Sequence, residues 1–241
     1  MGGAYHLTVR RASVFLWLLL VACSTGSPPN PTSLLRDSAN AMAGLRTVSA
    51  DVKFTAGKVT LQGFTLDSAS TKVRLPGDSD TLFKVKQGDF LVNVRVLTLG
   101  GKVYVQLPFS PLTELPPEQA KEVPDLSGLF DSQHGLPAVI PQGRSPQLQG
   151  SEQLEGVDCY KLATTYTADQ VASLLGAFRP GGDVAAVLWI GQSDKLIRKV
   201  TLTGPFEEGG GSATVQVQLH DFNKPVEIPA PAATPAPSPT A

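Results

Sequence analysis

The chain has 241 residues, of which 20 are basic and 21 are acidic, so its formal net charge is −1. It has no excess of basic side chains to neutralise phosphates, and a nucleic-acid partner is therefore not expected. Hydrophobic residues make up 41% of the sequence. That share and the length are sufficient for one domain with a sizeable core.

The N-terminus has the three regions of a secretory signal: the cations Arg10-Arg11, an apolar run over 12–22, and small residues before a cut. Leu20-Val21-Ala22-Cys23 resembles the bacterial lipobox, in which the cysteine becomes the lipid-linked mature N-terminus. The alternatives are an ordinary signal peptide or a single membrane helix, but the run is shorter than the ~20 residues that a span needs. We predict a signal peptide over 1–22, lipid attachment with palmitate at Cys23, and a flexible tether over 23–31.

The predicted cleavage leaves 18 basic and 21 acidic residues, a mature charge of −3. It also leaves Cys159 as the one cysteine besides the lipidated Cys23, so no intramolecular disulfide is available. We expect a packed thiol at Cys159. The alternative is a reactive thiol, but no histidine or second cysteine lies near it in sequence.

The first predicted element after the tether is an amphipathic helix over roughly 32–43. Its apolar and small residues recur at three- and four-residue spacing, and Gly44 suits a left-handed C-terminal cap. From Val48 to Phe54 apolar and polar residues then alternate, which predicts a strand with one apolar face.

The same alternation predicts further strands around 62–73, from Phe83, over 90–97 and over 103–107, with a hairpin turn at Gly100-Gly101. Consecutive strands without intervening helices indicate an antiparallel meander and exclude a parallel Rossmann-type sheet.

Prolines interrupt the pattern over 108–150, where 126–130 is compatible with a helical turn and 136–140 with an apolar loop. A long loop of this kind is either a binding loop or a surface connection, and the sequence supports both equally. Regular structure resumes with a strand over 156–164 and a helix that begins at the capping box Thr167-Ala168-Asp169-Gln170. The last predicted strands cover 184–190, 196–203 and 213–220, and the Pro/Ala tail over 229–241 is expected to be disordered.

Catalytic and metal-binding motifs are absent from the sequence. His134 and His220 stand outside any metal pattern, and there is no Gly-x-Ser-x-Gly elbow or phosphate-cradling loop. We therefore expect no enzyme activity, no cofactor and no metal.

Roughly six to nine one-sided strands are expected, with two amphipathic helices to cover them. The helices and the proline-rich segment either fill the covered face as an ordinary core or leave an apolar cavity for a long-chain ligand. The patterning alone favours the filled core.

The order of the elements carries a resemblance. After the lipobox come Leu34-Leu35-x-x-Ser38-Ala39, Leu99-Gly100-Gly101-Lys102-Val103-Tyr104-Val105, Leu154-Glu155-Gly156-Val157-x-x-Tyr160, Val187-Leu188-Trp189-Ile190 and Leu196-Ile197-Arg198-Lys199-Val200. This series resembles the actinobacterial LppX/LprA/LprF/LprG lipoprotein family over residues 33 to 223. The resemblance implies an α+β, LolA/LolB-like fold: a strongly curved antiparallel β half-barrel covered on its concave side by a few helices around an apolar cavity.

It further implies that the domain over 32–228 binds acylated lipids or glycolipids and carries them in the cell envelope. The protein would be anchored to the extracytoplasmic face of the cell membrane through Cys23, with an envelope transporter as a further partner. An envelope interaction or sensor lipoprotein that binds a protein partner is the alternative, because fold does not determine function.

The candidate cavity residues follow from these strands and helices, although alternation does not say which strand face is concave. The candidate walls are Val52, Phe54, Phe83, Val85, Val92, Val94, Val103, Val105 and Leu162, and the candidate covers are Met42, Val171, Leu174 and Leu175.

Overall fold

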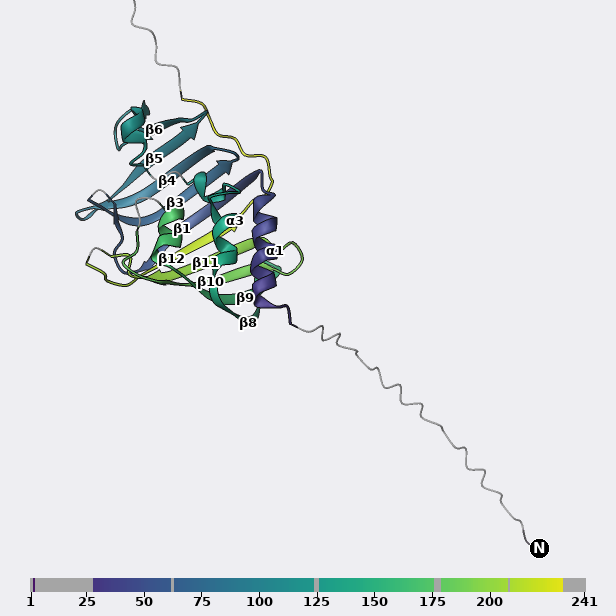
Figure 1. The fold of residues 1–241 in the computed structure, drawn as a ribbon. Helices are drawn as coiled ribbons and strands as arrows, with labels where there is room; N and C mark the ends of the chain where they lie inside the picture. Colours follow the sequence, from purple (N-terminus) through teal and green to yellow (C-terminus); the bar gives the residue numbers. More distant parts are fainter. Residues whose placement is uncertain are drawn as a thin grey trace, which may run out of the picture.

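The fold is a large antiparallel sheet with a few helices on one face (Figure 1). The computed structural model describes residue 2 and residues 28–61, 63–123, 126–175, 179–207 and 209–231. Cys23, all of the predicted signal peptide except residue 2, and most of the predicted tail lie outside these residues. Within them, no helix has the length and apolarity that crossing a bilayer requires.

The elements of the N-terminal half form one run of strands after a helix. They are α1 (Pro31–Ala43), β1 (Thr47–Ala56), β2 (Thr60–Leu61), β3 (Phe64–Arg74), β4 (Asp78–Gln87), β5 (Phe90–Leu99), β6 (Lys102–Gln106) and β7 (Thr113–Glu114). Short helices follow: α2 (Pro117–Ala120), η1 (Gly128–Phe130), α3 (Leu136–Val139) and η2 (Ile140–Gln142). The second half contains β8 (Arg144–Leu154), β9 (Val157–Tyr166), α4 (Ala168–Leu175), β10 (Val184–Gly191), β11 (Ile197–Gly204) and β12 (Ala213–His220).

The sheet joins two meanders through one long-range pairing. Its strand order is β7-β6-β5-β4-β3-β1-β12-β11-β10-β9-β8, with β2 paired to β3 outside this path. Each of these pairings is antiparallel, and the first meander meets the second where β1 pairs with β12. The predicted α+β class with an antiparallel meander is therefore confirmed.

Helix α1 begins where its N-terminal cap is available. The side chain of Asn30 accepts hydrogen bonds from the amides of Thr32 and Ser33, at 2.9 and 3.1 Å, and Pro31 occupies the first turn. The predicted left-handed cap at Gly44 is wrong, since its φ is −84°. The helix instead ends in short-range bonds, with the Gly44 amide donating to the Ala41 carbonyl at 3.2 Å, and this geometry needs no positive φ.

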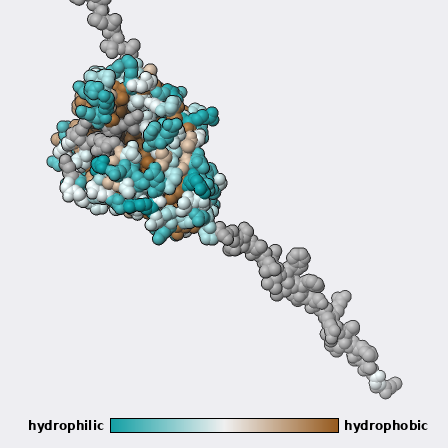
Figure 2. All heavy atoms as spheres, in the orientation of Figure 1, coloured by the Kyte–Doolittle hydropathy of each residue, from teal (hydrophilic) through white to brown (hydrophobic). Residues whose placement is uncertain are grey.

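The core has two parts. The first core cluster packs α1 against the β8–β12 half of the sheet and includes Leu34, Leu35, Met42, Leu162 and Ile190. The second core cluster lies on β3 to β6 and includes Leu66, Ala69, Phe83, Val85 and Val96. Hydrophobic surface is visible between polar patches in the space-filling view (Figure 2).

The proline-rich segment contains more regular structure than the helical turn expected over 126–130, which is observed as η1. Residues 144–150 belong to β8, which pairs with β9 as the outermost strand of the second meander. The segment before β8 forms α2, η1, α3 and η2, and α3 with η2 packs against α1 on the helix-covered face (Figure 1).

Candidate functional site

An apolar cavity of about 160 Å³ lies between the helix-covered face of the sheet and the segment from Leu126 to Leu174. Its floor comes from the sheet and the loop between β1 and β2: Ala50, Val52, Phe54, Val59, Leu66, Ala69, Thr71, Phe83, Leu188, Ile197, Val200, Leu202, Val215, Val217 and Leu219. Its cover comes from Leu126, Leu129, Phe130, Leu136, Val139, Ile140, Val171, Leu174 and Phe206, and Tyr166 lines it from the end of β9.

Strand register explains why the floor is apolar. Directly paired residues share a face of the sheet. The pairings place one row of side chains across it, here called the floor row, in the order Leu162, Leu188, Val200, Val217, Val52, Ala69, Phe83 and Val94. The six central members of the row line the cavity, and the two end members lie beyond it. The cavity therefore sits over the junction between the two meanders.

Two of the described lining residues carry polar side-chain groups, and both groups have protein partners. The hydroxyl of Thr71 lies 2.8 Å from that of Thr81, and the Tyr166 hydroxyl donates to the Ile140 carbonyl at 3.0 Å. Burial raises the pKa of Tyr166, which keeps its phenol protonated at neutral pH. The cavity consequently presents hydrocarbon to whatever occupies it.

The cover is held by local hydrogen bonds. Helix α4 starts at the predicted capping box: the Thr167 amide donates to the Gln170 side chain at 2.8 Å, and the Gln170 amide donates to the Thr167 hydroxyl at 3.3 Å. The Gln170 amide group also donates to the Gln142 side chain at 3.1 Å, which ties α4 to η2. The cover is thus assembled from two segments that are separate in sequence.

The structure brings together five of the residues proposed from sequence. Val52, Phe54 and Phe83 line the cavity from the sheet, and Val171 and Leu174 line it from α4. The other proposed residues lie elsewhere in the described structure. Val85, Val92, Val94, Val103 and Val105 belong to or pack against the second core cluster, and Leu162 and Met42 are fully buried in the first. The side chain of Leu175, like Cys23, lies outside the described structure.

Sequence reasoning missed the part of the cover between β7 and β8. Leu129 and Phe130 from η1 and Leu136 and Val139 from α3 line the cavity, with Ile140 of η2. These helices are too short to show helical periodicity. The available signals were the helical turn expected over 126–130 and the apolar run over 136–140, and both mark segments that reach the cavity.

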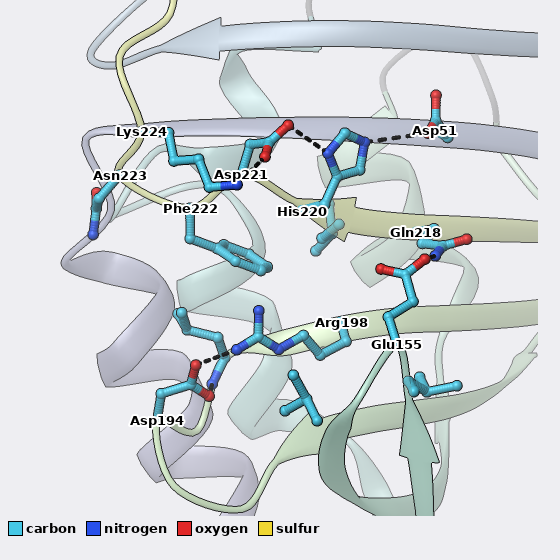
Figure 3. A pocket seen from close by; sticks show the side chains of 14 residues that line it. Asp51, Glu155, Asp194, Arg198, Gln218, His220, Asp221, Phe222, Asn223 and Lys224 are labelled. Carbon is cyan, nitrogen blue, oxygen red and sulfur yellow. Dashed lines mark hydrogen bonds and ion pairs between the residues drawn. The ribbon is translucent and has the colours of Figure 1, made fainter.

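A larger hollow of about 730 Å³ is an open polar groove beside the turn between β8 and β9 (Figure 3). In it, His220 lies between two carboxylates, with Nε2 3.2 Å from Asp51 and Nδ1 2.8 Å from Asp221. Hydrogen bonds from Lys224, first, and from His220 lower the pKa of Asp221. The guanidinium of Arg198 pairs with Asp194.

These groove charges are paired with one another, so the groove is a polar surface with its own internal network. Among the described residues, no group of His, Cys, Asp and Glu side chains is arranged to hold a metal ion. Cys159 is a free, fully buried thiol whose pKa is raised by burial, which disfavours the reactive thiolate.

The fold and cavity define a class of protein: an antiparallel sheet with helices that close over an internal apolar cavity. The chain belongs to the LppX_LprAFG lipoprotein family, whose model matches residues 30–228. This confirms the family resemblance seen in the sequence. It also confirms that the chain is not an enzyme, because the family is one of non-enzymatic lipoproteins, and membership implies a location in the cell envelope.

Two relatives show how the chain compares with named members. It is 24% identical over 223 residues to the lipoarabinomannan carrier protein LprG of Mycolicibacterium smegmatis, covering 89% of this chain and 91% of the relative. It is 26% identical over 232 residues to the putative diacylated glycolipid transporter LprF of Mycobacterium bovis, covering 87% and 81%.

Solved structures show the same fold. The crystal structure of LprF from Mycobacterium bovis superposes with a TM-score of 0.68 at 22% identity, over 86% of this chain and 100% of that one. LppX from Mycobacterium tuberculosis superposes with a TM-score of 0.61 at 23% identity, over 84% and 100%.

Proposed function

We propose that this protein is a membrane-anchored carrier that shields the acyl chains of a lipid or glycolipid in its cavity and moves them through the cell envelope. The single observation that supports it best is the cavity itself, whose lining has no unpaired polar side chain among the described residues. The names of LprG and LprF, a carrier and a putative transporter of glycolipids, point to the same ligand class.

The energetics explain what a carrier would provide. A 16-carbon acyl chain exposed to water costs about 12 kcal/mol, at ~0.8 kcal/mol per methylene, so unassisted transfer through an aqueous layer is slow. A hydrocarbon-lined cavity resembles the bilayer interior, and exchange between the two is then nearly neutral in free energy. The activity is shielding, with no bond made or broken.

The cavity must enlarge to do this. Its volume of about 160 Å³ is close to that of an apolar cavity that admits one benzene ring, on the order of 150 Å³. Ligand pockets usually measure roughly 300–1,000 Å³. In the proposed mechanism the short helices η1, α3 and η2 and helix α4 move away from the sheet, which wraps around the chain as a half-barrel.

The first test is native mass spectrometry, with organic extraction, of the soluble domain from Ser24 onward. Lipid that co-purifies in stoichiometric amount supports the carrier and identifies the acyl class. A ligand-free mass, together with no uptake of fluorescent acyl probes, contradicts it and favours an interaction protein.

A matched pair of variants tests the cavity. Ala69→Leu places three more carbons in the middle of the floor row, whereas Ser70→Leu places a leucine at the next position of β3, on the opposite, exposed face. We expect Ala69→Leu to weaken acyl-probe binding about tenfold or more and Ser70→Leu to leave it unchanged, with both folded by thermal unfolding. Equal binding by the two variants would remove the cavity assignment.

The anchor is tested separately. Cys23→Ala in the full chain should release the protein from membranes into the soluble fraction, because it removes the proposed lipid attachment site. Unchanged membrane retention of the Cys23→Ala protein contradicts lipidation at this residue and leaves the cavity tests unaffected.

A further inference from the structure

Four large apolar side chains stand exposed at one edge of the sheet. Phe90 is 76% and Leu91 55% exposed at the hairpin between β4 and β5, and Leu107 is 50% and Phe109 109% exposed where the chain leaves β6. These are the exposed large hydrophobic residues in the described part of the chain. Figure 2 shows hydrophobic surface between polar patches over the β4–β6 part of the molecule. We call these four residues the apolar rim.

The apolar rim is continuous with the cavity through Phe90, whereas Leu91 is paired with Lys86 and lies on the other face of the hairpin. Phe83 lines the cavity and is paired with Val94, and the next pair along the hairpin on the same face is Val85 with Val92. One more step on this face reaches Phe90, which is paired with Gln87 at the hairpin tip. An unbroken row of apolar side chains therefore leads from the cavity floor to solvent.

The second branch of the rim lies beside this row. Gln106 pairs with Arg95, so Leu107 follows on the side of Val94. Pro108 and Phe109 then form a turn in which the Ser110 amide donates to the Leu107 carbonyl at 3.1 Å. The rim thus covers both the hairpin tip and the adjacent end of β6.

Phe109 has a conformation that the fold does not require. Its φ is +62°, in the left-handed region that favours glycine and is unusual for a bulky residue. Its ring packs on nothing, since the residue is fully exposed. A strained, fully exposed phenyl group stabilises neither the turn nor the core, which indicates that the ring serves an interaction outside the domain.

We propose that the apolar rim docks on the surface of a lipid bilayer and is the port through which an acyl chain passes between the bilayer and the cavity. This inference rests on the proposed carrier function. Aromatic and leucine side chains at loop tips are suited to the boundary between head groups and acyl chains. The continuous apolar row would let a chain leave the bilayer without crossing water.

The charges near the rim indicate what kind of bilayer it fits. Lys84 and Lys86 are exposed on the other face of the hairpin, but Lys86 Nζ lies 4.0 Å from the Asp67 carboxylate and Asp89 stands in the turn. Two lysines are therefore offset by two aspartates. Docking should depend on the apolar side chains and respond little to salt or to anionic lipid.

The length of the tether favours a bilayer as the partner. Cys23 and Pro31 are 31 − 23 = 8 residues apart, a span of at most about 28 Å. A domain of this size has a radius of gyration of roughly 16 Å. The tether joins the domain at the start of α1, on the β8–β9 side and away from the rim (Figure 1), so a lipidated Cys23 would keep the whole domain near the membrane and the rim would supply the orientation.

The test is flotation of the soluble domain from Ser24 onward with phosphatidylcholine vesicles. We expect the wild-type domain to float with the vesicles and the double variant Phe90→Ser/Phe109→Gly to lose at least tenfold in partitioning. The glycine suits the backbone at position 109, so this substitution should not unfold the turn. Lys84→Gln/Lys86→Gln is the matched control and should float like the wild type.

Three results overturn the proposal: no flotation of the wild type, equal flotation of the rim variant, or flotation that is abolished by 0.5 M salt. A second assay, the transfer of a pyrene-labelled phosphatidylcholine, tests membrane docking and the carrier function separately. The rim variant should take up this probe normally from detergent and at least tenfold more slowly from vesicles, whereas Ala69→Leu should float normally and fail to take up the probe from either. If Ala69→Leu takes up the probe like the wild type, the carrier proposal fails while the docking result still stands on flotation.

Discussion

Tyr166→Phe tests a buried hydrogen bond that ties the cover to the sheet. Tyr166 ends β9 and is 6% exposed, and its hydroxyl donates to the Ile140 carbonyl of η2 at 3.0 Å. The substitution removes the hydroxyl and keeps the ring. The lost interaction is therefore this single bond between the sheet and the cover.

The expected loss of stability in Tyr166→Phe follows from the partners of this hydrogen bond. Losing a buried hydrogen bond costs about 1 kcal/mol, and more when its partner is left unpaired. The Ile140 carbonyl also accepts a long bond from the Gly143 amide, at 3.4 Å, so it is not left without a donor. We expect the free energy of unfolding to fall by about 1 kcal/mol at neutral pH.

At high pH, the effect of Tyr166→Phe on the free energy of unfolding should change sign. Burial raises the pKa of Tyr166 in the folded state, while an unfolded tyrosine ionises near pH ~10. The folded protein then binds more protons than the unfolded one, so this stabilisation is complete below pH ~10 and falls by about 1.4 kcal/mol per pH unit above it. The wild type and Tyr166→Phe should become equally stable just below pH ~11, and the variant should be the more stable above that.

Urea unfolding of both proteins between pH 7 and 11.5, followed by circular dichroism, measures this crossing. Tyr104→Phe, which removes a phenol from the half-buried strand β6, controls for the loss of one tyrosine. Stability curves for wild type and Tyr166→Phe that stay parallel over the whole range would show that Tyr166 ionises as freely as in the unfolded chain, and the argument from burial would be refuted.

Three further predictions concern packing. Gly57→Ala should destabilise the fold by about 2 kcal/mol or more in urea unfolding, because φ is +75° and the new Cβ would lie 2.6 Å from the Ser212 carbonyl oxygen; an unchanged midpoint would contradict this close approach of β1 to β12. Ser38→Ala should be neutral or stabilising by up to about 1 kcal/mol, because the Ser38 hydroxyl is buried in the described structure without a hydrogen-bond partner; a large loss of stability would reveal a partner. Cys159 should react with a thiol reagent only as fast as the domain unfolds, since it is fully buried; rapid labelling of the native domain would refute this.

Strands with one buried face were predictable from sequence, and the outermost strand was not. In β1, β11 and β12 the alternating apolar residues, such as Val52, Val200 and Val217, line the cavity, and in β5 they pack on the second core cluster, so the sequence pattern follows from one apolar face of a pleated strand. Strand β8 is exposed or half-exposed at all its positions and contains Pro146. A strand at the sheet edge that buries neither face has no reason to alternate, so its sequence carries no such signal.

The residues of the cavity were partly predictable for a related reason. The alternation of apolar and polar residues correctly places Val52, Phe83 and Val94 on one face of the sheet, because successive side chains of any strand point to opposite faces. Their order across the sheet depends on the pairing of β1 with β12, which joins residues far apart in sequence. That pairing puts Val52 at the centre of the floor row and Val94 at its end, beyond the cavity.

The same pairing connects the two proposals. With β1 at the junction of the meanders, the cavity lies across the middle of the sheet, and β4 and β5 lead from its floor to the edge where Phe90 is exposed. The cover is held to the β9 side of this cavity by the Tyr166 bond, and within the cover α4 is held to η2 by Gln170. A ligand that entered from the β4–β5 edge would meet apolar side chains first and these tethers last. Weakening the Tyr166 bond should therefore change how far the cavity opens without changing how the rim meets a membrane.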